Sequence, residues 1–549
     1  MENQNDFDGA AEALRACARH VERGGAAAET LAEELRRAAD QLGEPMRLAV
    51  AGQIKRGKST LVNALLGEEI TLTGQLELTY TVAELCFAEQ RVVTVHHQDG
   101  GSEQVTPADF HRMTNRSEDA ARLLGRVSRV EYGLPNELLR SFRLADTPGL
   151  GSVHGLDSEG TRAYLRISAF DGVSDRAAHE EALRASGRTG ESVHEDSVRE
   201  VEGADAVLYL FDRGLHDRDR AGVSDFLGGG GLGLTPMSAF GVLSRCDQQW
   251  PPGPDLPGDN DPLTWDPMAE SARIAEGLMG RPEVRGLFFA MVPVAGLLGL
   301  GAQTLTSDEL DHLTDLARVE PRRLTRRLAD AGRFGSAEQV RDVDLPAAHR
   351  LALVQRLGVW GIHLACGLLR DGAGEEELRA RLVEVSGVRG LRDLIVRHFG
   401  NRATLIKLGQ GLQRAGREVA IMRRDALRGG TPPHRSLGET AGRLERLRDR
   451  TPGFAELEVL EAHYRGELAL APAEIEQLLR ITGEYGTDTA ARLGLPADAP
   501  REALAEAALA GVRRWATREV DPGLDRASQR AAGCVRRGYE HLLDRVGAA

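Results

Sequence analysis

The sequence contains very little lysine. Lys55, Lys58 and Lys407 are the only lysines among the 69 lysine and arginine residues of the 549-residue chain. A position that keeps lysine against this bias is expected to need a compact, strongly hydrated ammonium group, which a planar guanidinium cannot imitate. Lys55 and Lys58 lie in one short segment, which points to that segment as a functional site. For Lys407 we accept drift as the explanation.

Cysteines and long apolar runs are also scarce. The five cysteines are scattered, odd in number and without a C-x-x-C pair, so the sequence predicts neither a disulfide framework nor a zinc site. This pattern fits a reducing cytoplasm. The longest apolar run, at residues 287–300, is about five residues shorter than a membrane span requires and contains Pro293. The acidic N-terminus lacks the apolar core of a signal peptide, so we expect no export and no span.

The composition bounds the class of protein. A net charge of −14, with 41% apolar and 28% charged residues, is typical of a soluble, acidic globular protein. Its overall electrostatic field repels nucleic acid, so we expect no nucleic-acid partner. A chain of this length can form two or three domains, each with its own core.

Residues 46–300 alternate short apolar runs with helical stretches. Such alternation predicts a mostly parallel α/β sheet. The two runs within 81–97 are close enough in sequence to predict one antiparallel hairpin between them. We expect strands at 46–52, 81–87, 91–97, 128–134, 142–149, 206–212, 240–247 and 287–296.

Helical spacing dominates the two ends of the chain. Residues 7–42, and nearly all residues beyond 303, place apolar side chains at the spacing of amphipathic helices. We therefore predict three parts. One or two neck helices at 1–42 pack on the C-terminal bundle, an α/β domain spans 43–302, and an all-α helical bundle or stalk spans 303–549.

A phosphate-binding motif lies at the start of the α/β part. Residues 52–59, GQIKRGKS, match G-x-x-x-x-G-K-[ST] between a predicted strand and a predicted helix. The glycines let main-chain N–H groups turn toward phosphates, and the helix adds the positive end of its dipole. Lys58 would bridge the outer phosphates, and Ser59 would ligate Mg²⁺. The sequence thus predicts an α/β P-loop NTPase with these nucleotide-binding residues: Gly52, Gln53, Ile54, Gly57, Lys58, Ser59 and Thr60.

Two further elements would complete the phosphate site. Asp146, at the end of a predicted strand, would hold Mg²⁺ through water, and the Gly149 N–H would sense the terminal phosphate. Thr79 lies between the two motifs, where a loop should supply a hydroxyl to the metal. Thr73 and Thr81 compete with it, and an ordinary β-strand threonine explains the spacing nearly as well.

A candidate base-recognition segment ends another predicted strand. Residues 244–247, SRCD, approximate [NT]-K-x-D, in which the Asp247 carboxylate accepts hydrogen bonds from the N1 and N2 donors of guanine. Ser244 is a weaker tether than Asn or Thr, while the aliphatic stem of Arg245 can still lie along the base. The loop at Ala295 and Gly296 is the candidate support under the base. Two alternatives stay open: Asp247 could cap the next helix, and the chain could be an ATPase.

These motifs together resemble the dynamin-like large GTPases. The resemblance is carried by GQIKRGKSTLVNALLG, by the later Thr73, Gly74 and Thr79, and by DTPGLGS and LSRCD. The form GxxKRGKST resembles the bacterial branch, and HFGNRATLIK at 398–407 is similar to the mycobacterial isoniazid-induced dynamin-like proteins. The resemblance covers nearly the whole chain and implies a Ras-like GTPase head, a neck, a helical stalk, and GTP or GDP with Mg²⁺ as cofactors.

The resemblance also assigns roles by motif. Thr79 would be the first switch, Asp146 and Gly149 the second, and Asp247 the guanine reader. Two departures leave the catalytic assistant open. Leu150 stands where small GTPases place a water-orienting glutamine, so another group must position the water.

The second departure lies in the phosphate-binding loop. Ile54 and Lys55 replace the Gln-Ser pair of animal dynamins. Lys55 or Arg56 could neutralise transition-state charge, within one chain or across a dimer, so both join Lys58 and Thr79 as candidate catalytic residues.

The predicted function is a GTPase that oligomerises, with itself or with a paralogous dynamin-like protein, and acts mechanically at membranes. The alternative is a soluble, GTP-switched scaffold whose helical half binds a protein. Two arginine clusters, at 414–428 and 322–327, are candidates for contact with anionic lipid, although such runs usually form solvated or ion-paired faces. We expect a cytoplasmic protein that can lie peripherally at the inner face of the cell membrane.

Overall fold

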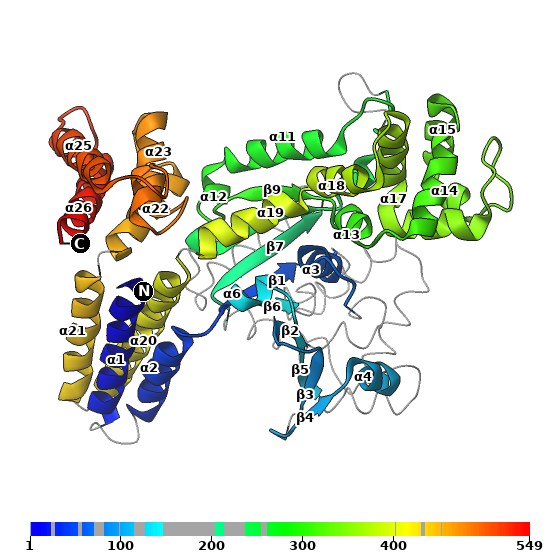
Figure 1. The fold of residues 1–549 in the computed structure, drawn as a ribbon. Helices are drawn as coiled ribbons and strands as arrows, with labels where there is room; N and C mark the ends of the chain where they lie inside the picture. Colours follow the sequence, from blue (N-terminus) through cyan, green and yellow to red (C-terminus); the bar gives the residue numbers. More distant parts are fainter. Residues whose placement is uncertain are drawn as a thin grey trace.

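The fold is given by a computed structural model that describes most of the chain. The described residues are 2–22, 28–52, 57–70, 82–97, 99–114, 127–146, 204–212, 236–253, 261–400, 402–429, 434–451 and 453–548. Figure 1 shows a sheet-centred head with a helical neck beside it and a second group of helices at the C-terminus.

A nine-stranded sheet in the order β4-β3-β5-β2-β6-β1-β7-β8-β9 forms the centre of the head. The strands are β1 (Met46–Gly52), β2 (Val82–Phe87), β3 (Val92–His97), β4 (Ser102–Val105), β5 (Val127–Leu134), β6 (Phe142–Asp146), β7 (Ala206–Asp212), β8 (Ala239–Ser244) and β9 (Met291–Val294). The β5–β2 pair and the row β6-β1-β7-β8-β9 are parallel. The predicted, mostly parallel α/β sheet with one antiparallel hairpin is confirmed, and only the short polar strand β4 was not expected.

The hairpin itself is formed by a different pair of strands from the one predicted. β2 and β3 are not neighbours, because β5 lies between them, parallel to β2 and antiparallel to β3. The antiparallel hairpin joins β3 to β4 instead. Val127, Val130, Tyr132 and Leu134 of β5 are buried, which fits a strand that pairs along both of its edges. Local spacing could not reveal this insertion.

Helices cover both faces of the sheet, as a parallel sheet requires. Alternate residues of β1 point to opposite faces: Leu48 and Val50 join the apolar cluster of α3 (Lys58–Leu66) and α19 (Val388–Ile395). Ala49 and Ala51 join the cluster on the other face. That cluster includes α11 (Pro267–Met279), α13 (Gly296–Thr304), α14 (Ser307–Ala317), α15 (Pro321–Leu328), α16 (Ala331–Ser336), α17 (Ala347–Arg370) and α18 (Glu375–Val385).

Helices α14 to α18 therefore share the core of the sheet. Buried Leu313, Leu353 and Leu382 belong to the same apolar cluster as Phe211 of β7. The division of the chain at residue 302 stays a prediction, and this packing favours a head that continues toward residue 400.

Helix α17 is long and apolar enough, by length and composition, to cross a membrane, and no other helix within the described ranges is. Two observations make it a core helix of the head instead. Gly358, with φ 69° and ψ 169°, interrupts it near the middle, so neither half reaches the length of a span. Its residues Leu353, Leu357, Trp360 and Ile362 are at most 3% exposed and pack under the sheet.

The neck consists of two N-terminal and two later helices. α1 (Glu2–Val21) and α2 (Glu29–Gln41) pack on α20 (Ala403–Arg428) and α21 (Arg435–Arg450) through one apolar cluster that includes Leu14, Leu35, Leu408 and Leu444. The C-terminal bundle has its own core around Trp515. Its helices are α22 (Gly453–Arg465), α23 (Pro472–Ile481), α24 (Thr489–Leu493), α25 (Arg501–Glu519) and α26 (Arg526–Ala548).

Lys407 has a structural role, so drift is the wrong explanation for it. Its ammonium group donates hydrogen bonds to the carbonyl oxygens of Gln41 (2.9 Å), Leu42 (3.1 Å) and Glu44 at the end of α2. An ammonium group has three donors on one small centre, which matches three converging carbonyls better than a planar guanidinium does. Lys407 thus joins α20 to the segment that leads from the neck into β1.

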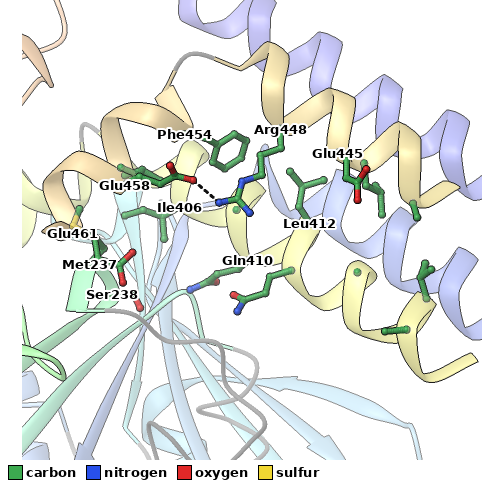
Figure 2. Close-up of a pocket in the computed structure, with 18 of the residues that line it drawn as sticks. Met237, Ser238, Ile406, Gln410, Leu412, Glu445, Arg448, Phe454, Glu458 and Glu461 are labelled. Carbon is green, nitrogen blue, oxygen red and sulfur yellow. Dashed lines mark hydrogen bonds and ion pairs between the residues drawn. The ribbon is translucent and has the colours of Figure 1, made fainter. Parts of the chain in front are cut away.

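A buried polar network joins the head, the neck and the C-terminal bundle. His398, in the π-helical turn η7 (Val396–Gly400), donates from Nε2 to the Met237 carbonyl oxygen of the head (3.0 Å). Arg402 lies 3.4 Å from His398 Nδ1 and pairs with Glu484 of the C-terminal bundle at 2.7 Å. A cavity of about 520 Å³ lies at the same junction, with the Arg448–Glu458 ion pair beside it (Figure 2).

Candidate nucleotide-binding site

The phosphate-binding motif lies between β1 and α3, as its sequence context required. Gly52 ends β1 with φ 142°, and a Cβ there would lie 2.8 Å from the Leu210 carbonyl oxygen of β7. Gly57 precedes α3 with φ 86°, a left-handed conformation that favours glycine. Backbone conformation therefore requires glycine at both positions, and at Gly52 the close approach of Leu210 requires it as well. Gln53, Ile54, Lys55 and Arg56 lie outside the described residues.

Lys58 and Ser59 begin α3 and meet the end of β6. Lys58 is 8% exposed, and its ammonium group donates to the Gly52 carbonyl oxygen at 3.2 Å. The Ser59 hydroxyl donates to Asp146 Oδ2 at 2.6 Å. β6 is parallel to β1, with Asp146 in register with Val50, so the sheet itself brings the two motifs together.

Asp146 has the properties of a metal-site carboxylate. Burial raises the pKa of its carboxyl above the ordinary value, while the Lys58 charge and the Ser59 hydrogen bond oppose that shift. Its Oδ1 atom is buried and accepts no hydrogen bond from any described group. A buried carboxylate oxygen without a donor is costly, and a divalent cation with oxygen ligands would satisfy it. The residues present therefore fit Mg²⁺, which Ser59 and Asp146 would hold.

A second cavity, of about 140 Å³, lies beside the start of α3. Three segments line it: Gly57, Thr60 and Leu61 from the phosphate-binding segment, Val242, Ser244, Arg245, Asp247 and Gln248 from the end of β8, and Val294, Gly296 and Leu297 after β9. The cavity is thus bounded by the phosphate-binding segment and by the segment predicted to read the base. We name it the base pocket.

The end of β8 is shaped to present Asp247 at this pocket. The Ser244 hydroxyl donates to the Phe211 carbonyl oxygen at 2.9 Å, which ties β8 to β7. Arg245 has φ 57° and turns the chain into the short helix η6 (Cys246–Gln249). Asp247, in the first turn of that helix, is 6% exposed.

The two residues predicted to support the base have different places in the structure. Ala295 is fully buried, its N–H donates to the Ser386 carbonyl oxygen at 2.9 Å, and it is not among the residues that line the base pocket. Gly296, the other residue of the predicted pair, lines the pocket with Leu297. Thr79 and Gly149 lie outside the described residues, so their roles stay predictions.

Sequence reasoning missed two residues behind the pocket. A Cβ at Gly358 would lie 3.3 Å from Asp247 Oδ2, so the interruption in α17 lies directly against this carboxylate. Ser386, after α18, holds the Ala295 loop. A glycine inside an otherwise helical pattern was the signal available for Gly358; Ser386 carried none.

Comparison with known proteins decides the family. The model of the Dynamin family matches residues 48–170. The isoniazid-induced protein IniC of Mycobacterium tuberculosis is 30% identical over 517 residues, which cover 94% of this chain and 93% of IniC. The chain belongs to the bacterial dynamin-like GTPases. Membership of this GTPase family supports guanine-nucleotide binding by the chain.

Other bacterial dynamin-like GTPases match over shorter stretches or more weakly. The bacterial dynamin-like protein of Nostoc punctiforme is 31% identical over 116 residues, which cover 19% of this chain and 16% of that protein. Among solved structures, a chain from an oligomerised bacterial dynamin pair matches with 12% identity and a TM-score of 0.31, covering 97% of this chain and 90% of its own.

Proposed function

We propose that the protein hydrolyses GTP with Mg²⁺, that nucleotide-loaded heads pair, and that this assembly does mechanical work at a membrane. The observation that carries the chemistry is the contact between Ser59 and Asp146, next to the buried Lys58 ammonium. The mechanical part follows from family membership rather than from the geometry. The partner head belongs to a second copy of the chain or to a paralogous dynamin-like protein.

The phosphate half of the site would act mainly by position and charge. Lys58 would donate to the outer phosphates, and the N–H groups at the start of α3 would add the positive end of the helix dipole. Mg²⁺, when bound, would neutralise charge on the outer phosphates. Ser59 and Asp146 would hold it, Asp146 through water, and Thr79 would add a second hydroxyl.

The remaining catalytic roles fall to residues that motif matching assigns. Lys55 or Arg56 would place a cation on the charge that develops on the transferred phosphoryl group. Gly149 would bind the terminal phosphate with its N–H and so report which nucleotide is bound.

The base half of the site would supply specificity. The Asp247 carboxylate accepts hydrogen bonds only, so it suits the N1–H and N2–H₂ donors of guanine and leaves adenine unpaired. Discrimination by a buried polar group is large, because the wrong base leaves that group without a partner.

GTP turnover measured against protein concentration, with and without lipid vesicles, tests the proposal. Turnover per molecule that rises with concentration would support head pairing, and a further rise with vesicles would support action at a membrane. Turnover independent of both, with no vesicle binding in the presence of GTP or a non-hydrolysable analogue, would favour the soluble scaffold. Absence of GTP turnover under all conditions would contradict the enzymatic part.

A further inference from the structure

The last two turns of α20 carry an exposed face of unusual composition. Leu427 is 67% exposed and Ile421 is 40% exposed, although both are large and apolar. At about 100° per residue, Arg424 and Arg428 lie between Ile421 and Leu427 around the helix, and Arg423 lies about 40° beyond Leu427. Ala415, which is buried in the neck core, lies on the opposite side of the helix. We name this surface the α20 end face.

The arginines of this face differ in their partners from the other arginines that the sequence grouped with them. In the part of the chain that the structure describes, Arg423 and Arg428 form no ion pair, and Arg424 pairs with its exposed neighbour Asp425 at 3.4 Å. On α15, by contrast, Arg322 pairs with Asp261, while Arg323 and Arg327 pair with Asp342. Arg414, earlier on α20, pairs with Glu34.

The α20 end face also lies where a large partner could reach it. α20 begins at the head, where Lys407 contacts the end of α2. Arg414 then contacts Glu34, earlier in α2, so the two helices run antiparallel and α20 ends at the far end of the neck. Figure 1 shows the neck helices α1, α2, α20 and α21 as one bundle beside the sheet.

We propose that the α20 end face docks on the surface of an anionic lipid bilayer. The guanidinium groups would contact lipid phosphates, and Leu427 and Ile421 would enter the boundary between headgroups and acyl chains, as on interfacial amphipathic helices. A protein with a net charge of −14 is repelled by an anionic membrane elsewhere on its surface, so local basic charge is needed for attachment. The inference rests on the membrane part of the proposed function and adds the site of contact.

Vesicle co-sedimentation of the full chain tests this proposal. The variant R423Q/R424Q/R428Q removes three charges from the α20 end face, and R322Q/R323Q/R327Q removes the three ion-paired charges of α15 as a matched control. Each arginine near an anionic surface strengthens binding by about fivefold, so the first variant is expected to bind phosphatidylglycerol vesicles at least about tenfold more weakly than wild type. The control is expected to bind as wild type does, and phosphatidylcholine vesicles should bind neither protein.

A second variant tests the apolar part of the face. Leu427→Ser should weaken binding severalfold and leave its salt dependence unchanged, because it removes apolar contact and no charge. Circular dichroism and GTP turnover in solution should be unchanged in all three variants, since none of these residues belongs to the nucleotide site.

Three results would overturn the inference. If R423Q/R424Q/R428Q binds phosphatidylglycerol vesicles as strongly as the wild type does, the membrane contact lies elsewhere on the protein. The proposed function would not be affected by that result. Failure of the wild type to bind either vesicle, with or without GTP, would remove both the inference and the membrane part of the proposed function. If the wild type forms a dimer and does not bind vesicles, and R423Q/R424Q/R428Q does not form that dimer, the α20 end face binds a second copy of the chain instead.

Discussion

Gly358 and Asp247 are neighbours although they are 111 residues apart in the sequence. A Cβ atom at Gly358 would lie 3.3 Å from Asp247 Oδ2, in a backbone conformation with φ 69°. Helix α17 therefore backs the carboxylate that faces the base pocket. We expect this contact to couple the packing of α17 to the position of the Asp247 carboxylate.

Gly358→Ala is expected to weaken GTP binding more than an ordinary change inside a helix. The new methyl group needs a strained backbone and crowds Asp247, which should lower the free energy of unfolding by about 1–3 kcal/mol and lower the preference for GTP over ATP. Gly367→Ala, in the same helix and with no atom within 4 Å of its added Cβ, is the matched control. Competition binding and thermal unfolding measure both effects, and equal behaviour of the two variants would contradict the positioning role.

Asp247→Asn is expected to remove guanine selectivity. The amide presents a donor where the carboxylate offers only acceptors, so it meets a guanine N–H group with another donor. GTP affinity should fall by at least about tenfold, while the weaker affinity for ATP should stay nearly constant. Competition of a labelled GTP analogue by ATP measures the ratio. An unchanged ratio of GTP affinity to ATP affinity would show that Asp247 does not contact the base. Capping of the next helix would then be the better explanation of this residue.

Lys407→Arg is expected to destabilise the protein, even though arginine is its common cation. The planar guanidinium cannot direct three donors to the carbonyl oxygens of Gln41, Leu42 and Glu44 from one centre. The expected loss is about 1.5–3 kcal/mol of unfolding free energy, as for other hydrogen bonds to charged groups. Denaturant unfolding measures it. An unchanged midpoint and slope of the unfolding curve would mean that lysine is not required at position 407, and neutral sequence drift would then explain it.

His398 should make the protein less stable in mild acid. Burial and the Arg402 charge lower its pKa from the ordinary 6.5 to about 3, although the Met237 hydrogen bond opposes the shift. Between these values the unfolded chain binds a proton that the folded chain does not, so stability falls as the pH decreases. The contribution is about 1.4 kcal/mol per pH unit.

The variant His398→Gln separates this effect from other acid effects. Its side-chain amide can still donate to the Met237 carbonyl oxygen but does not titrate in this range. Urea unfolding at several pH values below 6.5 should show a shallower loss of stability in the variant. Parallel curves for variant and wild type would show that His398 does not carry the pH dependence.

Local patterns in the sequence predicted much of the head. The eight expected strands form, and the phosphate-binding motif lies between a strand and a helix, because both depend on residues close together in the chain. Ser59 meets Asp146 because β1 pairs with β6, a pairing that the predicted sheet left open.

Contacts between distant segments could not be predicted in this way. The insertion of β5 between β2 and β3, the contact of Gly358 with Asp247 and the role of Lys407 all join residues far apart in the chain. A glycine or a lysine carries no signal of which distant group it meets. Composition likewise could not separate the arginines of α15, which are mostly ion-paired, from those at the end of α20.

The most direct test of the account is titration calorimetry of GTP with Mg²⁺ on the wild type and on Lys58→Ala. The wild type is expected to bind one GTP per chain. The variant should lose at least about a hundredfold in affinity, because two or more charge-assisted hydrogen bonds to phosphate disappear. Its circular dichroism and unfolding midpoint should match the wild type. Equal GTP affinity in the two folded proteins would contradict the assignment of the phosphate site on which the account depends.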